Sequence, residues 1–206
     1  MAVPLPHDQA PDEQLLPRIA AGDTQAFALL FRRRQAAVYR FALHMAGTPA
    51  VAEDVTQDVF VEVMRVAARY EPGRSNVISW LYGIARNCAR RRLERDRNLE
   101  PLTDQDERDD AATFAVHPDP LGDLTREESI ARLREAILSL PFRYRETVVL
   151  CDLQELSYAE AADALGCPVG TVRSRLHRGR ELLTTKLAAE RNWKTPLKLP
   201  GVRSIA

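Results

Sequence analysis

Three arginines near the C-terminal end of the chain, Arg173, Arg175 and Arg178, fall within one short stretch that also contains Ser174 and His177. A guanidinium group presents a rigid fork of N–H donors, which matches the edge of a guanine base or a phosphate group bidentately. Side chains of this type, spaced so closely, are suited to binding nucleic acid. The chemistry they predict is recognition rather than catalysis.

The residues before this stretch predict the elements that position it. Ser157 and Glu160 fit a capping box, which would open a short helix that ends at Leu165. Residues 166–168 make a turn, and a second helix follows. This is helix-turn-helix spacing, and the second helix would place its basic face in the major groove of DNA. The residues expected on the inner faces of the two helices are Tyr158, Ala161, Ala162, Leu165, Val169, Val172 and Leu176. The alternative is a helix hairpin whose arginines form a solvated face.

The N-terminal part of the chain has the apolar periodicity of amphipathic helices. A first long helix is expected from Thr24 to about Ala46, with Gly47 ending it. A second would start at Thr48-Pro49, with the Thr48 hydroxyl as cap, and a third near Ser75. The apolar residues expected to be buried are Phe27, Leu30, Phe31, Val38, Phe41, Ala42, Met45, Val55, Val59, Val63, Val66, Val77, Leu81, Ile84 and Cys88.

The charge of the chain is unevenly distributed. The formal net charge is zero, but residues 98–125 contain eight acidic residues and one basic residue, so the remainder is basic. This acidic, proline-bearing segment lacks periodicity and is interpreted as a flexible linker. After it, Ile130, Leu133, Ile137 and Leu140 share one helical face, Pro141 breaks the helix, and another helix runs through Cys151.

The predicted fold class is therefore all-α, with two helical domains joined by a linker. A bundle of three to four helices spans residues 12–97, the acidic linker spans 98–125, and the helix-turn-helix domain spans 126–192. Residues after Asn192 are expected to form a frayed tail.

Several classes of function are disfavoured by the composition. The three cysteines form no CxxC pair and the four histidines are scattered, so neither a disulfide framework nor a metal site is expected. No catalytic residue set and no glycine-rich phosphate loop is visible, so we expect no enzyme and no cofactor. No apolar stretch approaches the ~20 residues of a membrane span, and we expect a cytoplasmic protein without membrane insertion.

The basic helix and its surroundings resemble a known family. Residues 166–180 resemble the −35-reading helix of extracytoplasmic-function (group 4) sigma factors of bacterial RNA polymerase. The fourth conserved region of that family is matched also by Leu140-Pro141, by residues 144–146 and by residues 156–158. Residues 52–60 and 79–87 are similar to the second conserved region. Both predicted domains are covered, in order, so the resemblance is specific.

The resemblance implies three binding surfaces. Contacts with the −35 element are expected from Ser157, Tyr158, Thr171, Arg173, Ser174, Arg175, His177 and Arg178. The −10 element, with a base flipped out of the non-template strand, would be held by Gly73, Arg74, Ser75, Asn76, Trp80, Asn87, Arg90 and Arg91. The clamp helices of the largest subunit of core RNA polymerase would be bound by Asp54, Gln57, Asp58 and Phe60. An anti-sigma factor is a further expected partner.

Some of these assignments have alternatives. On periodicity alone the acidic face at Asp54, Gln57 and Asp58 reads as a solvated surface, and Trp80 is equally suited to the core. Residues 88–92 depart from the family pattern, since many members carry an Asp-His pair after the position of Asn87. The linker could run through polymerase channels or be simply solvated. The rival function is a stand-alone helix-turn-helix repressor or activator, which would need a dimerisation helix and would leave the first domain without a role.

Overall fold

The computed structural model describes residues 10–73, 75–97 and 126–193, and every regular element among them is helical. The expected all-α class is confirmed. The first group of helices consists of α1 (Asp12–Ala20), α2 (Thr24–Ala46), α3 (Pro49–Val66), the short 3₁₀ turn η2 (Ala67–Arg69) and α4 (Val77–Arg97). The second consists of α5 (Arg126–Leu138), α6 (Phe142–Val148), the π-helical turn η3 (Val149–Leu153), α7 (Tyr158–Leu165) and α8 (Val169–Trp193). The expected linker and tail lie outside the described residues.

Local signals determine where the helices of the first group begin and end. The Asp23 carboxylate accepts hydrogen bonds from the backbone N–H groups of Gln25 and Ala26, at 2.9 and 3.0 Å, and so caps α2. Gly47 ends α2 in the left-handed region at φ 82°, as predicted. The cap predicted for α3 is wrong, because the Thr48 side chain makes no capping hydrogen bond. Pro49 in the first turn suffices to start that helix.

The core of the first group is formed mainly by α2, α3 and α4. Phe41, Met45, Val55, Val59 and Val63 are almost completely buried there. Four predictions of burial are too strong, because Phe27, Phe31, Val66 and Ile84 are only half-buried.

Helix α1, which the periodicity did not indicate, is held against α2 by an ionic cluster. Both oxygens of the buried Asp12 carboxylate accept from arginines of α2, Arg33 at 2.9 Å and Arg34 at 2.5 Å. The carboxylate also stands in the first turn of α1, where the helix dipole favours negative charge.

In the second group, α6 packs against α8. The contact is close because residue 179 is glycine: a Cβ there would lie 2.7 Å from Cγ2 of Val148. Leu140, Val148 and Leu176 form a small buried cluster at this crossing. On α5 only the C-terminal part of the expected apolar face is covered. Ile137 is buried, whereas Ile130 and Leu133 are 41% and 38% exposed.

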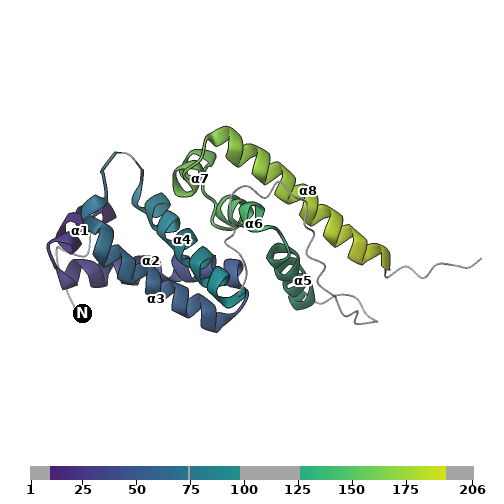
Figure 1. Ribbon diagram of the computed structural model, residues 1–206, viewed down its shortest axis with the longest axis horizontal. Coiled ribbons are helices and arrows are strands. Elements are labelled where there is room, and N and C mark those ends of the chain that lie inside the picture. Colours follow the sequence, from purple (N-terminus) through teal and green to yellow (C-terminus); the bar gives the residue numbers. More distant parts are fainter. Residues whose placement is uncertain (1–9, 74, 98–125, 194–206) are drawn as a thin grey trace, which may run out of the picture.

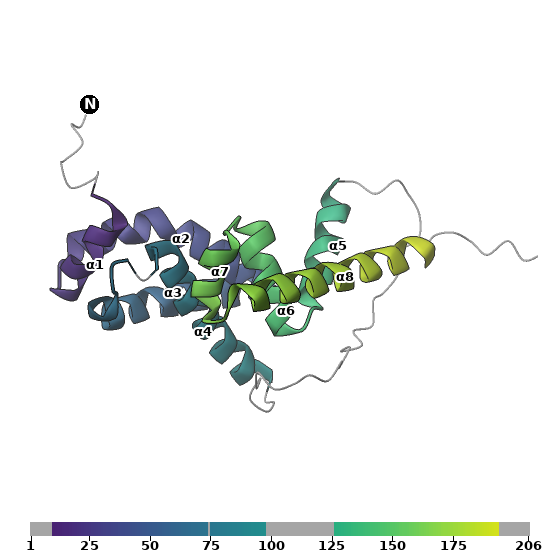
Figure 2. The ribbon, with the colours of Figure 1, turned by 90° about the horizontal axis from the view of Figure 1, so that it is seen from above.

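The two groups pack directly against each other. Helix α7 lies against α4, and the C-terminal end of α2 meets α5, as Figures 1 and 2 show from two directions. A continuous cluster of buried apolar side chains includes members of both groups, such as Phe41 and Leu81 from the first and Val149 and Ala161 from the second.

Arg145 forms a joint between the groups. Its Nη1 donates to the Met45 carbonyl oxygen at the end of α2, at 2.7 Å, and its Nη2 donates to the carbonyl oxygens of Leu138 and Leu140 at the end of α5. Only 5% of Arg145 is exposed. The last carbonyl groups of a helix lack partners within the helix, and here one guanidinium serves two helix ends.

Candidate nucleic-acid interface

The capping box at the start of α7 is present as predicted. The backbone N–H and the hydroxyl of Ser157 donate to Oε2 of Glu160, at 2.8 and 2.7 Å, and the backbone N–H of Glu160 donates to the Ser157 hydroxyl at 3.3 Å. The hydrogen bonds from the Ser157 side chain and backbone, together with one from Asn76, hold the pKa of Glu160 below its usual value.

The helix-turn-helix follows the predicted pattern. Gly166 takes the left-handed conformation at φ 63°, which ends α7 and turns the chain toward α8. Ala161, Val172 and Leu176 are buried where the two helices cross. Tyr158 was expected on this inner face, but it is 39% exposed, and the guanidinium of Arg173 lies 5.9 Å from the centre of its ring. Tyr158 therefore contacts the basic outer face.

The outer face of α8 exposes Arg173, Ser174, His177 and Arg178. The Ser174 hydroxyl donates to the carbonyl of half-buried Thr171, at 3.0 Å. Glu181, one turn further on, lies 3.2 Å from His177 and 3.4 Å from Arg178. Arg173 lies away from that carboxylate, in the first turns of α8. The first turns are the part of a recognition helix that enters the groove most deeply.

Arg175 does not share this outer face. Its side chain is only 21% exposed, and its Nη1 lies 3.7 Å from Oε1 of Glu146, a carboxylate with no exposed surface. The same carboxylate accepts from Arg86 of α4, at 2.5 Å to Nε and 3.3 Å to Nη2. The spacing could have indicated this, because Arg175 is three residues after the buried Val172 and four before the buried Gly179.

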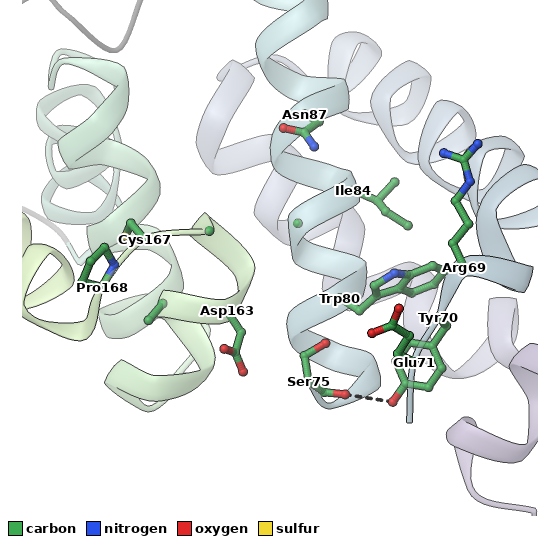
Figure 3. A pocket seen from close by; sticks show the side chains of 13 residues that line it. Arg69, Tyr70, Glu71, Ser75, Trp80, Ile84, Asn87, Asp163, Cys167 and Pro168 are labelled. Carbon is green, nitrogen blue, oxygen red and sulfur yellow. Dashed lines mark hydrogen bonds between the residues drawn. The ribbon is translucent and has the colours of Figure 1, made fainter. Parts of the chain in front are cut away.

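The candidate −10 surface is centred on a cavity of about 710 Å³ beside α4. Figure 3 shows Trp80 next to Tyr70 and Glu71 on one side of the cavity, while Asp163, Cys167 and Pro168 line it from the helix-turn-helix. The Trp80 and Tyr70 rings meet edge to face, with centroids 5.5 Å apart, and the Tyr70 hydroxyl donates to the Ser75 carbonyl at 2.9 Å. Trp80 and Asn87 both line this cavity. An aromatic wall next to an amide group could hold an unstacked base.

The other residues predicted for this surface are more dispersed. Asn76 caps α4, since its Oδ1 accepts from the Ser79 N–H at 2.7 Å, and Gly73 turns the preceding loop at φ 89°. Arg91 was expected on the same face as Trp80 and Asn87, but it lines a second cavity beside α3 and donates to Cys88 Sγ at 3.3 Å. Arg90 is half-buried, 3.9 Å from Glu94. Arg74 lies outside the described residues. The predicted −10 set did not include the other lining residues, which are Arg69, Tyr70, Glu71, Gly83 and Ile84 of the first group and Ala162, Asp163, Gly166, Cys167 and Pro168 of the second.

The candidate polymerase surface lies on the exposed face of α3. Asp54 and Asp58 lie on this face, 3.1 Å from Arg92 and 3.8 Å from Arg95 respectively, and Gln57 is exposed between them. Phe60 does not belong to this face. It is 2% exposed and packs edge to face against Phe31, with centroids 4.8 Å apart.

Two apolar side chains on α3 were not predicted for that surface. Val61 and Met64 are 52% and 50% exposed. They follow Gln57 by four and seven residues, so helical spacing places them on its face. Val61 also lines the second cavity, of about 670 Å³, together with Asp58. An exposed apolar pair with acidic neighbours is typical of a protein-binding surface rather than of a nucleic-acid site.

In the described residues, no group of three or more potential metal ligands comes together, and the three cysteines are free thiols. Within the same residues, none of the helices is both long and apolar enough to span a membrane.

Comparison with known proteins follows the same division of the chain. Residues 30–98 match the family model of Sigma-70 region 2, and residues 130–183 match that of Sigma-70, region 4. The fold and the two matches define a sigma factor of RNA polymerase.

Curated relatives narrow this further. The chain is 32% identical over 186 residues to the RNA polymerase sigma-H factor of Pseudomonas aeruginosa, covering 87% of this chain and 95% of that protein. It is 34% identical over 187 residues to the ECF RNA polymerase sigma-E factor of Escherichia coli K12, covering 87% and 96%. A match of 38% identity to the ECF sigma factor SigE of Mycolicibacterium smegmatis covers 82% of this chain and 65% of that longer protein. The chain belongs to the extracytoplasmic-function sigma factors.

Two solved structures are similar. CnrH, in complex with the cytosolic domain of CnrY, gives a TM-score of 0.63 at 25% identity, covering 86% of this chain and 97% of that one. The sigma factor RpoE of Bartonella quintana, in complex with the anti-sigma factor NepR, gives 0.59 at 28% identity, covering 80% and 98%.

Proposed function

We propose that this sigma factor divides its work between the two groups of helices. The exposed face of α3 docks on core polymerase, the cavity beside α4 holds a melted −10 strand, and the outer face of α8 binds the −35 duplex. The domain limits are those predicted from the sequence, residues 12–97 and 126–192, with residues 98–125 as the linker. The single observation that carries the proposal is the helix-turn-helix with its exposed basic face at Arg173, Ser174, His177 and Arg178, because this surface suits a DNA groove.

The −10 assignment is supported by the chemistry of the cavity. Trp80 offers an aromatic wall and Asn87 an exposed amide, and both belong to α4. The polymerase assignment is supported by Asp54, Gln57 and Asp58, to which we add Val61 and Met64. Phe60 acts indirectly, by supporting α3 from the core. We propose that promoter opening draws on binding energy alone, with no reaction catalysed by this chain, and that the protein acts in the cytoplasm.

An anti-sigma factor is a further proposed partner. RpoE of Bartonella quintana was determined in complex with one, and this chain shares its fold over most of its length. A protein of this kind would keep the sigma factor from polymerase. Copurification with the tagged full chain identifies it.

Run-off transcription tests the proposed function. Core polymerase with the full chain should start transcription on promoters that core polymerase alone ignores. A stand-alone repressor or activator, which is the rival function, would give no transcript with bare core polymerase.

A further inference from the structure

The surfaces assigned to the two promoter elements are engaged with each other in this structure. Nδ2 of Asn76, at the start of α4, donates to Oε1 of Glu160 in the capping box of α7, at 2.7 Å. The same Asn76 caps α4 through its other side-chain atom. The N-terminal ends of two helices that are expected to approach different DNA elements are thus joined by one amide and one carboxylate.

A second set of contacts lies further along α4. The Tyr82 hydroxyl donates to Oε1 of Gln154, at 2.8 Å, and Arg86 pairs with Glu146 through two of its nitrogens. Arg86 and Glu146 are 13% and 0% exposed. Little solvent screens this pair, so it holds α4 against the second group more firmly than a surface ion pair would.

The Arg86 contact can nevertheless open without abandoning a buried charge. Glu146 has a second cation within its own group, because Nη1 of Arg175 lies 3.7 Å from Oε1. When Arg86 leaves, Arg175 can move closer and keep the carboxylate paired. Removing one partner of a buried pair is costly mainly when the other charge is left alone, and here it is not.

Close backbone packing completes the interface. A Cβ at Gly83 would lie 3.3 Å from the carbonyl oxygen of Ala164 and 4.0 Å from its Cα. Glycine at this position lets α4 and α7 approach to near backbone contact. A larger side chain at position 83 would force the two helices apart.

This arrangement places carboxylates where a DNA strand would run. Glu160 is bound to Asn76, and Asp163 of α7 lines the cavity that contains Trp80 and Asn87 (Figure 3). A phosphate backbone laid along α4 would meet these negative groups. In contrast, the face of α3 that carries Gln57, Val61 and Met64 is exposed in the same structure.

We infer that the contact of α4 with the second group, at Glu146 of α6, at Gln154 and at α7, is an autoinhibitory latch: the compact chain can dock on polymerase through α3 but keeps a −10 strand away from α4 until the two groups separate. The inference rests on the proposed function of the α4 cavity. Arg86 and Tyr82 hold the latch, and Gly83 permits it. Neither Arg86 nor Tyr82 lines the cavity, so their side chains can be changed without altering its walls.

The test uses the full chain without polymerase and three variants of equal charge. Arg86→Gln, alone and with Tyr82→Phe, removes the latch. Arg95→Gln removes one positive charge from the exposed end of the same helix, where Arg95 contacts Asp58 of α3 and the Arg91 carbonyl oxygen of its own helix. Small-angle X-ray scattering reports the separation of the two groups. Fluorescence anisotropy reports binding of two probes, a single-stranded −10 oligonucleotide and a −35 duplex, both taken from the promoter that is tested in the run-off assay.

We expect Arg86→Gln to enlarge the radius of gyration and to tighten binding of the −10 strand several-fold, although it removes a positive charge. Arg95→Gln should leave the radius unchanged and weaken −10 binding slightly. Binding of the −35 duplex should stay within about twofold in all variants, since Arg173 and Arg178 are exposed already.

An unchanged radius in both latch variants, or an enlarged radius with −10 binding no tighter than in the original chain, would overturn the latch. Gly83→Leu provides an independent check by scattering alone, since its bulk separates α4 from α7 without removing any charge. Failure of the proposed function would look different. In that case neither probe would bind any variant and no transcript would form, whatever the scattering shows.

Discussion

Gly179 of α8 and Val148 of α6 are in such close contact that a Cβ on the glycine would lie 2.7 Å from the valine Cγ2. The recognition helix α8 can therefore pack this closely against α6 only because residue 179 has no side chain. Gly179→Ala gains up to about 1 kcal/mol of helix propensity, but overpacking of this kind costs about 1–3 kcal/mol. We expect a net loss of stability in urea unfolding.

Gly170→Ala is the matched control on the same helix, because a Cβ there has no atom within 4 Å. It should leave stability unchanged or raise it slightly. If both alanine variants were equally stable, α6 and α8 would not be limited by this contact.

Ser157→Ala removes the hydroxyl half of the capping box at the start of α7. Loss of a helix cap typically costs about 0.5–2 kcal/mol, and we expect that loss in thermal unfolding at neutral pH. The lowered pKa of Glu160 makes this contribution pH-dependent. It is present above the usual glutamate pKa and is lost as pH falls through the lower, folded value. The difference between original and variant should therefore shrink in acid.

His44 of α2 also makes stability depend on pH, because the folded chain favours its neutral form. Burial is the main cause that lowers the pKa of His44, and the positive charges of Arg134 on α5 and of Arg40 lower it further. The folded chain thus favours neutral His44, so stability is full above the ordinary pKa of 6.5 and falls as the pH drops below it. His44→Gln should flatten unfolding curves between neutral and mildly acidic pH. An unchanged slope in the His44→Gln variant would contradict this account.

Arg173→Ala and Arg175→Ala should have different effects. Arg173 is exposed in the first turns of α8, and its loss should lower discrimination at −35 by about 1–3 kcal/mol if it reads a base edge. Arg175 contacts the buried Glu146, so its loss should mainly lower the free energy of unfolding. Gel shifts with matched and scrambled −35 duplexes at several salt concentrations measure the first effect, and urea unfolding measures the second. If the Arg175 variant lost as much selectivity at −35 as the Arg173 variant and kept its free energy of unfolding, Arg175 would have to leave Glu146 to reach DNA.

Val61→Asp tests the polymerase face of α3. The side chain is 52% exposed, so the fold should be unaffected, while a charge in the apolar part of an interface should weaken binding of core polymerase by about tenfold or more. Ala36→Asp, at an exposed position of α2, serves as the control. Equal binding of both variants in a pull-down would remove Val61 from the interface.

The sequence predicted those features that depend on residues close together in the chain. The end of α2 at Gly47 and the capping box of Ser157 and Glu160 were placed correctly, because each is determined within a few residues. The basic outer face of α8 was predicted for the same reason. Arg175 was misplaced because its three-residue spacing from Val172 was outweighed by its arginine neighbours.

Features that depend on packing between distant segments could not be predicted. Asn76 and Glu160 are 84 residues apart, and nothing near either residue indicates the other. The burial of Phe60 depends on Phe27 and Phe31 of α2, and the exposure of Ile130 and Leu133 depends on how far α8 covers α5. Helical periodicity identifies an apolar face but not the area that a partner helix covers.

The Arg145 joint limits how the two groups can move. This side chain ties the end of α2 to the end of α5, while the α4–α7 contacts lie on a different pair of helices. A motion that breaks the second contact and keeps the first cannot be a translation, because one point stays fixed. It is a rotation about the end of α2, in which α8 sweeps through an arc as the arm of a lever. The distance along α8 from this pivot to Arg173 would then set how far the DNA-binding residues travel for each degree of opening.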